Sequence, residues 1–159
     1  MPLDAIQFRA TLGRFASGVT ILTMRDRDGA DHGMTATSFS SLSLDPPLIL
    51  VCVNQAAAMF EALAQAQHVA VNILSAEQQG VAQAFALKDA DRFGGFSFQR
   101  GIGDVPVLVG ALAHLECEVH ARHKAGDHTI IVGLVQAASA SEAGDPLIYY
   151  RSGYRRLRS

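Results

Sequence analysis

Hydroxyl-bearing side chains crowd one short stretch of the sequence, between a glycine and a double proline. Residues 33–43 read GMTATSFSSLS and contain six serine or threonine residues. Such short side chains, with Gly33 and Ala36 beside them, let a flat ring approach the backbone, while hydroxyl and N–H groups can meet ring carbonyls or a phosphate. Threonine also suits an edge strand and serine a turn, without any ligand. The stretch alone therefore leaves two interpretations open, a binding site or an ordinary strand edge.

The six histidines do not have the spacing of a metal site. His114 and His120 share one face of a predicted strand but stand six residues apart, which is about 20 Å at the rise of a β-strand. His120 and His123 point to opposite faces, because side chains alternate along a strand. We interpret the face that carries His114, Glu116, Glu118, His120 and Arg122 as solvated, with Leu115, Cys117, Val119 and Ala121 facing inward. No metal is expected.

Other catalytic motifs are absent from the sequence. It contains no GxSxG nucleophile motif, and Cys52 and Cys117 form no CxxC pair, which is typical of reduced core cysteines in a cytoplasmic protein. The segment GGFSFQRGIG is rich in glycine but does not follow a strand and open a helix. A pyridine nucleotide, if used, is therefore not expected to be held by a Rossmann domain of this chain.

The elements around these residues predict a mainly β protein. We expect a first helix over residues 2–15, with Asp4 as its cap and Phe8, Leu12 and Phe15 on one face. Further helices are expected over residues 56–67 and 76–87, and a long polar loop over 88–104. The expected strands cover residues 18–26, 33–43, 48–53 and 68–75, two long strands within 110–141 that turn at 125–127, and a closing segment at 145–157.

Several strands joined partly by hairpins, with few helices, favour an antiparallel, Greek-key-like β-barrel with helices packed outside. Residues 1–159 are expected to form one domain, with 49% hydrophobic and 18% charged residues. A net charge of −2 gives no field for a polyanion, so neither nucleic acid nor an anionic membrane is an expected partner. The sequence has no apolar run of membrane-spanning length and no secretory signal, so a cytoplasmic location is expected.

Six segments occur in an order and spacing typical of one family: FRATLGRFASGVTILT, HGMTATSFSSLSLDPPLILVCVN, DRF, LECEV, AGDHTIIVGLV and PLIYYRSGYRRL. From Phe8 to Leu157 the chain resembles the short-chain flavin reductases, which include the reductase components of two-component flavin monooxygenases. The resemblance implies the FMN-binding split-barrel fold. It also implies a homodimer with the flavin near the subunit interface.

The resemblance also implies the positions of the site. The implied flavin neighbours are Met34, Thr35, Ala36, Thr37, Ser38, Cys52, Val53, Asn54, Ala58, Arg92, Phe93 and Tyr150. Backbone N–H groups along the hydroxyl stretch would then stabilise negative charge on the reduced ring. His128 would position the nicotinamide, and Tyr150 with the pair Tyr154 and Arg155 would approach the same pocket.

One segment departs from the family pattern. After Asn54 many family members carry serines and a threonine before a helix, where a phosphate could bind, but here the residues are Gln55-Ala56-Ala57-Ala58-Met59. The backbone N–H groups remain and the hydroxyls are lost, which suits a flavin that is bound and released. FMN and FAD both stay possible.

The implied activity is that of an NAD(P)H-dependent flavin reductase. Hydride would pass from NADH or NADPH to FMN or FAD, and the reduced flavin would serve a separate monooxygenase. A non-catalytic flavin carrier on the same fold is the alternative, and a pyridoxamine-phosphate-oxidase-like enzyme is a third candidate. The sequence leaves open the partner monooxygenase, its substrate and the preferred nucleotide.

Overall fold

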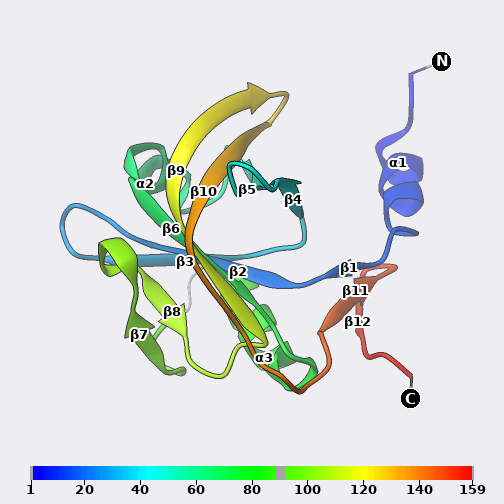
Figure 1. Ribbon diagram of the computed structural model, residues 1–159. Coiled ribbons are helices and arrows are strands. Elements are labelled where there is room, and N and C mark those ends of the chain that lie inside the picture. Colours follow the sequence, from blue (N-terminus) through cyan, green and yellow to red (C-terminus); the bar gives the residue numbers. More distant parts are fainter. Residues whose placement is uncertain (1, 89–91, 159) are drawn as a thin grey trace.

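Figure 1 shows the computed structural model, which describes residues 2–88 and 92–158. Its helical elements are α1 (Ala5–Leu12), α2 (Phe60–Gln65), η1 (Ala76–Gln78), α3 (Gln79–Ala86) and η2 (Ile102–Asp104). Its strands are β1 (Ser17–Gly18), β2 (Thr20–Arg25), β3 (Asp31–Ala36), β4 (Phe39–Ser43), β5 (Leu48–Asn54), β6 (His68–Ile73), β7 (Phe98–Arg100), β8 (Pro106–Leu108), β9 (Ala113–Ala125), β10 (His128–Ala140), β11 (Ile148–Tyr150) and β12 (Gly153–Arg155). The expected mainly β, antiparallel architecture is confirmed.

The two edge strands of the main sheet follow each other in the chain at the hydroxyl-rich stretch. The strand order of this sheet is β3-β2-β6-β9-β10-β5-β4, so β3 and β4 are its two edges. Thr37 and Ser38 join the two edges. Ser38 Oγ donates to the Cys52 carbonyl at 2.7 Å, and the Cys52 N–H donates to the Ser38 carbonyl at 3.1 Å. The single strand expected over residues 33–43 is therefore two strands, because the chain passes here from one edge of the main sheet to the other.

Two expected helices are shorter in the structure. Asp4 caps α1 through a bond from the Ile6 N–H, as expected, but α1 ends at Leu12 with Gly13 as its C-cap. The helix expected from residue 56 begins at Phe60, because the side chain of Asn54 accepts the Ala56 N–H and holds the alanines in a turn. The helix expected over residues 76–87 is present as η1 and α3, with a capping box at its start.

The core has two main parts. Inside the barrel, apolar side chains of β2, β5, β6, β9 and β10 pack together, and α2 closes one end with Met59, Leu63 and Ala66. Cys117 lies in this core, where burial raises the pKa of its thiol to about 12 and keeps it unreactive. The second part lies outside the barrel under α3, where Phe85 packs against phenylalanines of the segment 93–98.

A fully buried asparagine connects the two-stranded sheet β7–β8 to the barrel by hydrogen bonds. Asn72 on β6 donates to the Ile21 carbonyl at 3.0 Å and accepts the Leu108 N–H at 2.9 Å. It also donates to the buried hydroxyl of Thr23, which in turn donates to the Pro106 carbonyl. Each of these buried polar groups is satisfied, so β8 is held against β2 and β6 in one position.

The outer face of β9 is solvated in part. Glu118, His120 and Arg122 are exposed, as expected, but Glu116 is half-buried. Glu116 lies under η2 and accepts the Ile102 N–H at 2.7 Å. Farther along the strand, Arg122 contacts the C-terminal end of α2. Alternation along a strand shows which residues point outward, but not which outward residues another segment will cover.

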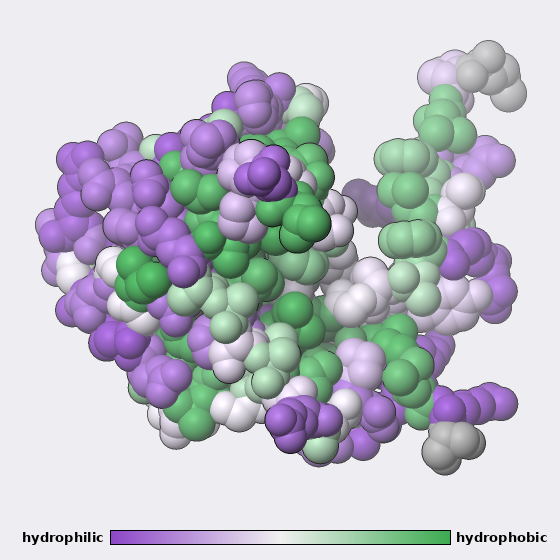
Figure 2. All heavy atoms as spheres, viewed as in Figure 1, coloured by the Kyte–Doolittle hydropathy of each residue, from purple (hydrophilic) through white to green (hydrophobic). Residues whose placement is uncertain are grey.

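The first helix stands apart from the barrel. Figure 1 shows α1 beside the small sheet β1-β11-β12. One hydrogen bond connects the two, because the Arg151 N–H, in the turn between β11 and β12, donates to the carbonyl of Gly13 at the end of α1. No residue of α1 is buried, and Phe8, Leu12 and Phe15 are 49%, 56% and 82% exposed. Figure 2 shows apolar atoms both on α1 and on the side of the barrel across the gap. The exposed apolar surface formed by these side chains is larger than is usual on a soluble monomer.

No helix among the described residues is long and apolar enough to span a membrane. In the same part of the chain, no three His, Cys, Asp or Glu side chains are grouped closely enough to hold a metal ion.

Candidate functional site

Strand pairing in the main sheet brings three segments to one rim of the barrel. They are the seam, which we define as Thr37 and Ser38 between β3 and β4, the end of β5, and the β9–β10 hairpin. Asn54 lies opposite His128 in the β5–β10 ladder. Two residues earlier on β5, Cys52 is bonded to Ser38 through both backbone and side chain. Thr37, Ser38 and Asn54 are exposed, and His128 is half-buried. Four polar residues that are far apart in the sequence therefore form one exposed rim, the seam rim.

The turn after β5 is fixed to the β9–β10 hairpin. The Gln55 N–H donates to the Asp127 carbonyl at 3.0 Å, and Gln55 Nε2 donates to the His128 carbonyl at 3.3 Å. The N–H groups of Ala56 and Ala57 are bonded to Asn54. Three successive N–H groups are thus used inside the protein. The expectation that these backbone N–H groups stay available to a phosphate is therefore wrong for Gln55, Ala56 and Ala57, and it now concerns the exposed Ala58.

His128 follows a two-residue turn at the tip of the hairpin. Gly126 has a φ of +60°, a conformation that glycine adopts easily, and the turn places Asp127 beside the imidazole. His128 Nδ1 lies 2.6 Å from Asp127 Oδ1. This hydrogen bond holds the pKa of Asp127 below its usual range. Because the carboxylate fixes Nδ1, the ring presents Nε2 as its other polar atom.

Several of the implied flavin neighbours turn their side chains away from solvent. Met34 packs against the barrel core, and Ala36 and Val53 are buried. Thr35 Oγ1 donates to the Ala82 carbonyl on α3 at 2.6 Å. Ala36 and Val53 therefore offer no exposed side chain to a ligand. Within the implied stretch 34–38, the exposed side chains are those of Thr37 and Ser38.

The segment around Arg92 packs against β3 rather than against His128. Arg92 Nη1 donates to the Gly33 carbonyl at 2.6 Å. Phe93 packs edge-on against Phe85, with ring centroids 5.1 Å apart. A Cβ at Gly33 would lie 2.6 Å from a carbon of Phe85, so these rings use the close approach that the glycine permits. The room that Gly33 was expected to give a flat ligand is therefore filled by protein side chains.

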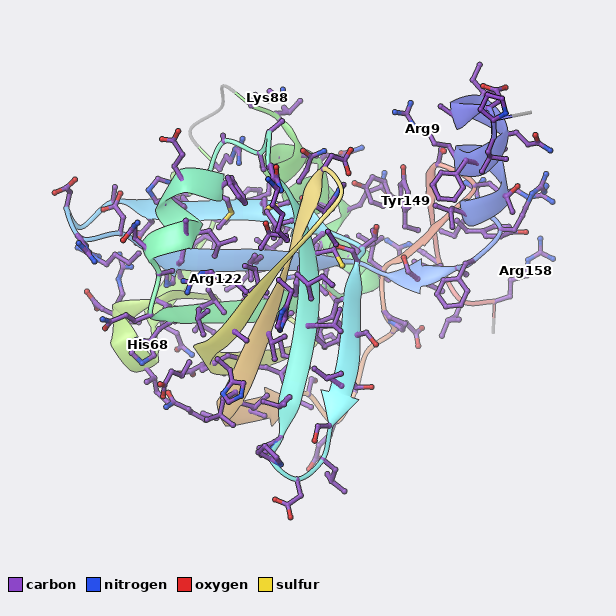
Figure 3. The ribbon with its side chains drawn as sticks, turned by 90° about the horizontal axis from the view of Figure 1, so that it is seen from above. Arg9, His68, Lys88, Arg122, Tyr149 and Arg158 are labelled. Carbon is purple, nitrogen blue, oxygen red and sulfur yellow. The ribbon has the colours of Figure 1, made fainter. Side chains whose placement is uncertain are left out.

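The C-terminal tyrosines belong to the small sheet. Tyr149 and Tyr154 pack against each other with centroids 5.4 Å apart, and Arg151 lies over the ring of Tyr150. Burial raises the pKa of Tyr154. Figure 3 shows Tyr149 on the side of α1, away from the barrel. Within the described part of this single chain, neither Tyr150 nor Arg155 is hydrogen-bonded to the seam rim.

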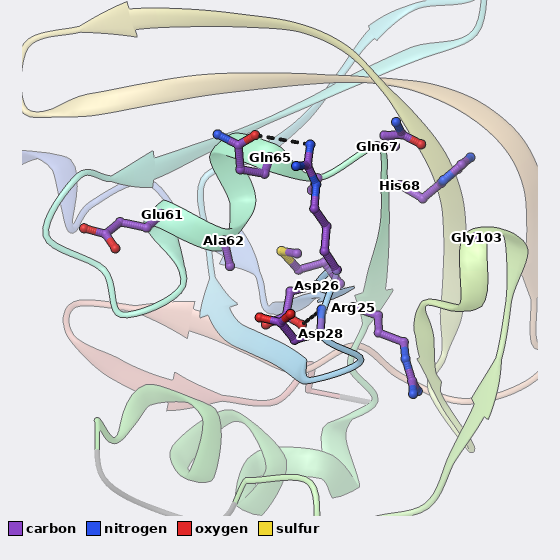
Figure 4. A pocket seen from close by; sticks show the side chains of 12 residues that line it. Arg25, Asp26, Asp28, Glu61, Ala62, Gln65, Gln67, His68 and Gly103 are labelled. Carbon is purple, nitrogen blue, oxygen red and sulfur yellow. Dashed lines mark hydrogen bonds between the residues drawn. The ribbon is translucent and has the colours of Figure 1, made fainter.

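A cavity of about 480 Å³ lies elsewhere, between the β2–β3 turn and α2 (Figure 4). Its wall includes Arg25, Asp28, Gln65 and His68, and it contains none of the implied flavin neighbours. The charges near it are largely paired within the protein, since Arg25 lies 3.3 Å from Asp104. None of the four residues of the seam rim lines this cavity.

The mainly β, antiparallel fold and the comparisons with known proteins together define the class of protein. A family model described as "Flavin reductase like domain" matches residues 12–158. The chain belongs to this family, which confirms the resemblance noted from the sequence and identifies an oxidoreductase of the flavin reductase type.

Individual relatives agree. The NADH-dependent flavin reductase of a Rhodococcus species is 43% identical over 96% of this chain and 86% of that protein. The reductase component of 4-hydroxyphenylacetate 3-monooxygenase of Thermus thermophilus is 41% identical over 94% of this chain and 95% of its own length. The NADH:FAD oxidoreductase SgcE6 of Streptomyces globisporus, solved with NAD and FAD fragments, is similar with a TM-score of 0.92 and 37% identity, covering 98% of this chain and 93% of that one.

Proposed function

We propose that this protein passes hydride from NADH to a flavin bound at the seam rim, and then releases the reduced flavin to a separate monooxygenase. The observation that carries this proposal is the meeting of exposed Thr37, Ser38 and Asn54 with His128 on one rim of the barrel. The named relatives support NADH as the donor and a monooxygenase as the recipient.

The residues of the rim have distinct proposed roles. Bound flavin supplies the hydride acceptor. Thr37, Ser38 and the nearby backbone would meet the polar edge and ribityl chain of the flavin, and the turn at Ala58 would lie near its phosphate. His128, held through Nδ1 by Asp127, would donate or accept a hydrogen bond at Nε2 and orient the nicotinamide. Arg92 and Phe93 would support β3 through the contacts that they make at Gly33 and Phe85.

Steady-state assays test the activity. Purified protein should oxidise NADH or NADPH only when FMN, FAD or riboflavin is present. Binding of flavin without turnover above the spontaneous rate would instead support the flavin-carrier alternative. Comparing the three flavins and two nucleotides would also give the preferred pair.

We further propose that the working form is a homodimer. The exposed apolar side chains of α1 and of the β4–β5 hairpin, where Leu42 and Leu44 are 49% and 93% exposed, fit a second copy of this chain. The seam rim adjoins the β4–β5 hairpin. A second copy could therefore complete an open site, and the C-terminal tyrosines of one chain could serve the rim of the other.

The proposed dimer makes a prediction about the exposed apolar side chains in α1 and directly after it. We expect sedimentation of a dimer at micromolar concentration, and Phe15→Glu should shift it toward monomer and weaken flavin binding, because a buried charge opposes the apolar contact. Leu87→Glu introduces the same charge at another exposed apolar position and should leave the dimer intact. A wild-type monomer that turns over flavin normally would contradict the proposal.

The alanines after Asn54 make a second prediction. Ala58→Ser should tighten FMN binding, since one hydrogen bond to a charged phosphate contributes about 1.5–3 kcal/mol at most. Ala64→Ser, on the exposed side of α2, is the matched control and should bind FMN as the wild type does. Titration by flavin fluorescence quenching measures both. Equal affinities for the two variants would place the phosphate elsewhere.

We also propose that residues 1–159 act as one domain in the cytoplasm. The two free cysteines support a reducing compartment.

A further inference from the structure

The helix α2 is too short to be stable without anchors. It has six residues, and isolated helices need about 12–15 residues to form in water. Its N-cap residue, Met59, makes no side-chain capping bond. On its inner side, Leu63 and Ala66 are buried in the barrel core, so the carbonyl groups near its C-terminal end need partners inside the protein.

Arg122 supplies these partners from the neighbouring strand β9. Its Nη2 atom donates to the Leu63 carbonyl at 3.0 Å and also to the Ala66 carbonyl. Figure 3 shows Arg122 beside α2. A guanidinium at the C-terminal end of a helix satisfies unpaired carbonyls and interacts favourably with the helix dipole. Arg122 therefore adds a charged donor at this end, where the Leu63 carbonyl also accepts the Ala66 N–H at 3.1 Å.

The other end of α2 is connected to the seam rim. It follows directly on the turn at Asn54, which is bonded to the β9–β10 hairpin through Gln55. Arg122 belongs to the same hairpin and lies opposite Ile131, three residues after His128. Hairpin, helix and turn therefore form a closed ring of contacts, with Gln55 as one bridge and Arg122 as the other.

We propose that Arg122 is a positioning residue that sets the spacing between the turn at Asn54 and His128, and through it the affinity for flavin. The proposal rests on the proposed function for the placement of flavin at this turn. Without the guanidinium, the end of α2 would lose two hydrogen bonds, and the helix could shift and carry Ala58 and Asn54 with it. Displacements of about 1 Å in such groups are enough to weaken binding and catalysis.

The test compares Arg122→Met, Arg122→Lys and the matched control Lys124→Met. Lys124 is an exposed cation on the same strand, two residues away. Direct titration with FMN gives the dissociation constant, and steady-state kinetics separate KM from kcat. We expect Arg122→Met to raise the FMN dissociation constant and the flavin KM about 10-fold, with kcat at saturating flavin within about twofold of wild type. Arg122→Lys keeps one charged donor and should be intermediate, and Lys124→Met should match the wild type.

A lower melting temperature with unchanged flavin affinity in Arg122→Met would overturn the proposal, because it would leave Arg122 a purely structural role. If Arg122→Met does not fold, Arg122→Lys decides in the same way: an FMN dissociation constant equal to the wild-type value contradicts the proposal. Failure of the proposed function is distinguishable, since a wild type that binds FMN but oxidises no NADH would still show the effect of Arg122 in the direct titration.

Discussion

Replacing His128 by alanine is expected to lower kcat/KM for NADH about 100-fold, the loss that results when a reacting group is misplaced by about an ångström. The flavin dissociation constant should stay nearly unchanged, because the proposed flavin contacts come from the seam and the turn after β5. Asp127 holds the imidazole at Nδ1, so the ring is already oriented before the nucleotide binds. His128→Asn should recover part of the loss, since it keeps a hydrogen-bonding group near the same place.

Steady-state kinetics beside a thermal melt separate the two possible roles of His128. The residue ends a two-residue turn and pairs with Ala125, so it could simply complete the hairpin. A variant that melts markedly earlier and yet turns over normally when folded would make His128 structural. Gln136→Ala, in the exposed part of β10, is the control and should change neither property.

Asn72→Ala is expected to lower the free energy of unfolding by about 3–4 kcal/mol. The substitution leaves the Leu108 N–H buried without a partner, at about 1–3 kcal/mol, removes the side-chain donor to the Ile21 carbonyl and to the Thr23 hydroxyl, and adds a small cavity. The loss should extend to function. β8 pairs with β7, and Phe98 of β7 packs against Phe93 with centroids 4.9 Å apart, next to Arg92.

Chemical denaturation of Asn72→Ala and of an exposed control gives the comparison. Gln136 bonds only at the surface, to Glu118, so Gln136→Ala should change the unfolding free energy by no more than about 0.5 kcal/mol. A loss below about 1 kcal/mol in Asn72→Ala would mean that the Leu108 N–H finds another partner, and that the segment β7–β8 is not held by this network.

The sequence predicted the fold well where local signals agree with long-range pairing. The hairpin of β9 and β10 turns at Gly126 and Asp127, as the glycine and the flanking β-branched residues indicate. The division of the expected strand 33–43 into β3 and β4 was not predicted, because an alternating pattern does not show where a chain leaves one sheet edge for another. The helix expected from residue 56 was too long, since three alanines favour a helix but the side chain of Asn54 forms a competing turn.

The candidate site was less predictable than the fold. The resemblance points to residues of β3, β5 and the β9–β10 hairpin, yet it does not show that Val53 is buried in the core and that Met34 packs against it. Arg122 is exposed, as expected, but nothing in the pattern of β9 shows that its guanidinium bonds the carbonyls at the end of α2. Gln55 carries no motif either, and its role follows only from the pairing of β5 with β10.

The most direct measurement of the central claim is anaerobic mixing of the purified protein with FMN and NADH, followed by absorbance. We expect the absorbance of oxidised flavin to disappear in step with NADH, one flavin reduced per NADH consumed, and far faster than without protein. Flavin that binds to the protein but stays oxidised, with NADH consumed no faster than in the protein-free control for either FMN or FAD, would contradict the account.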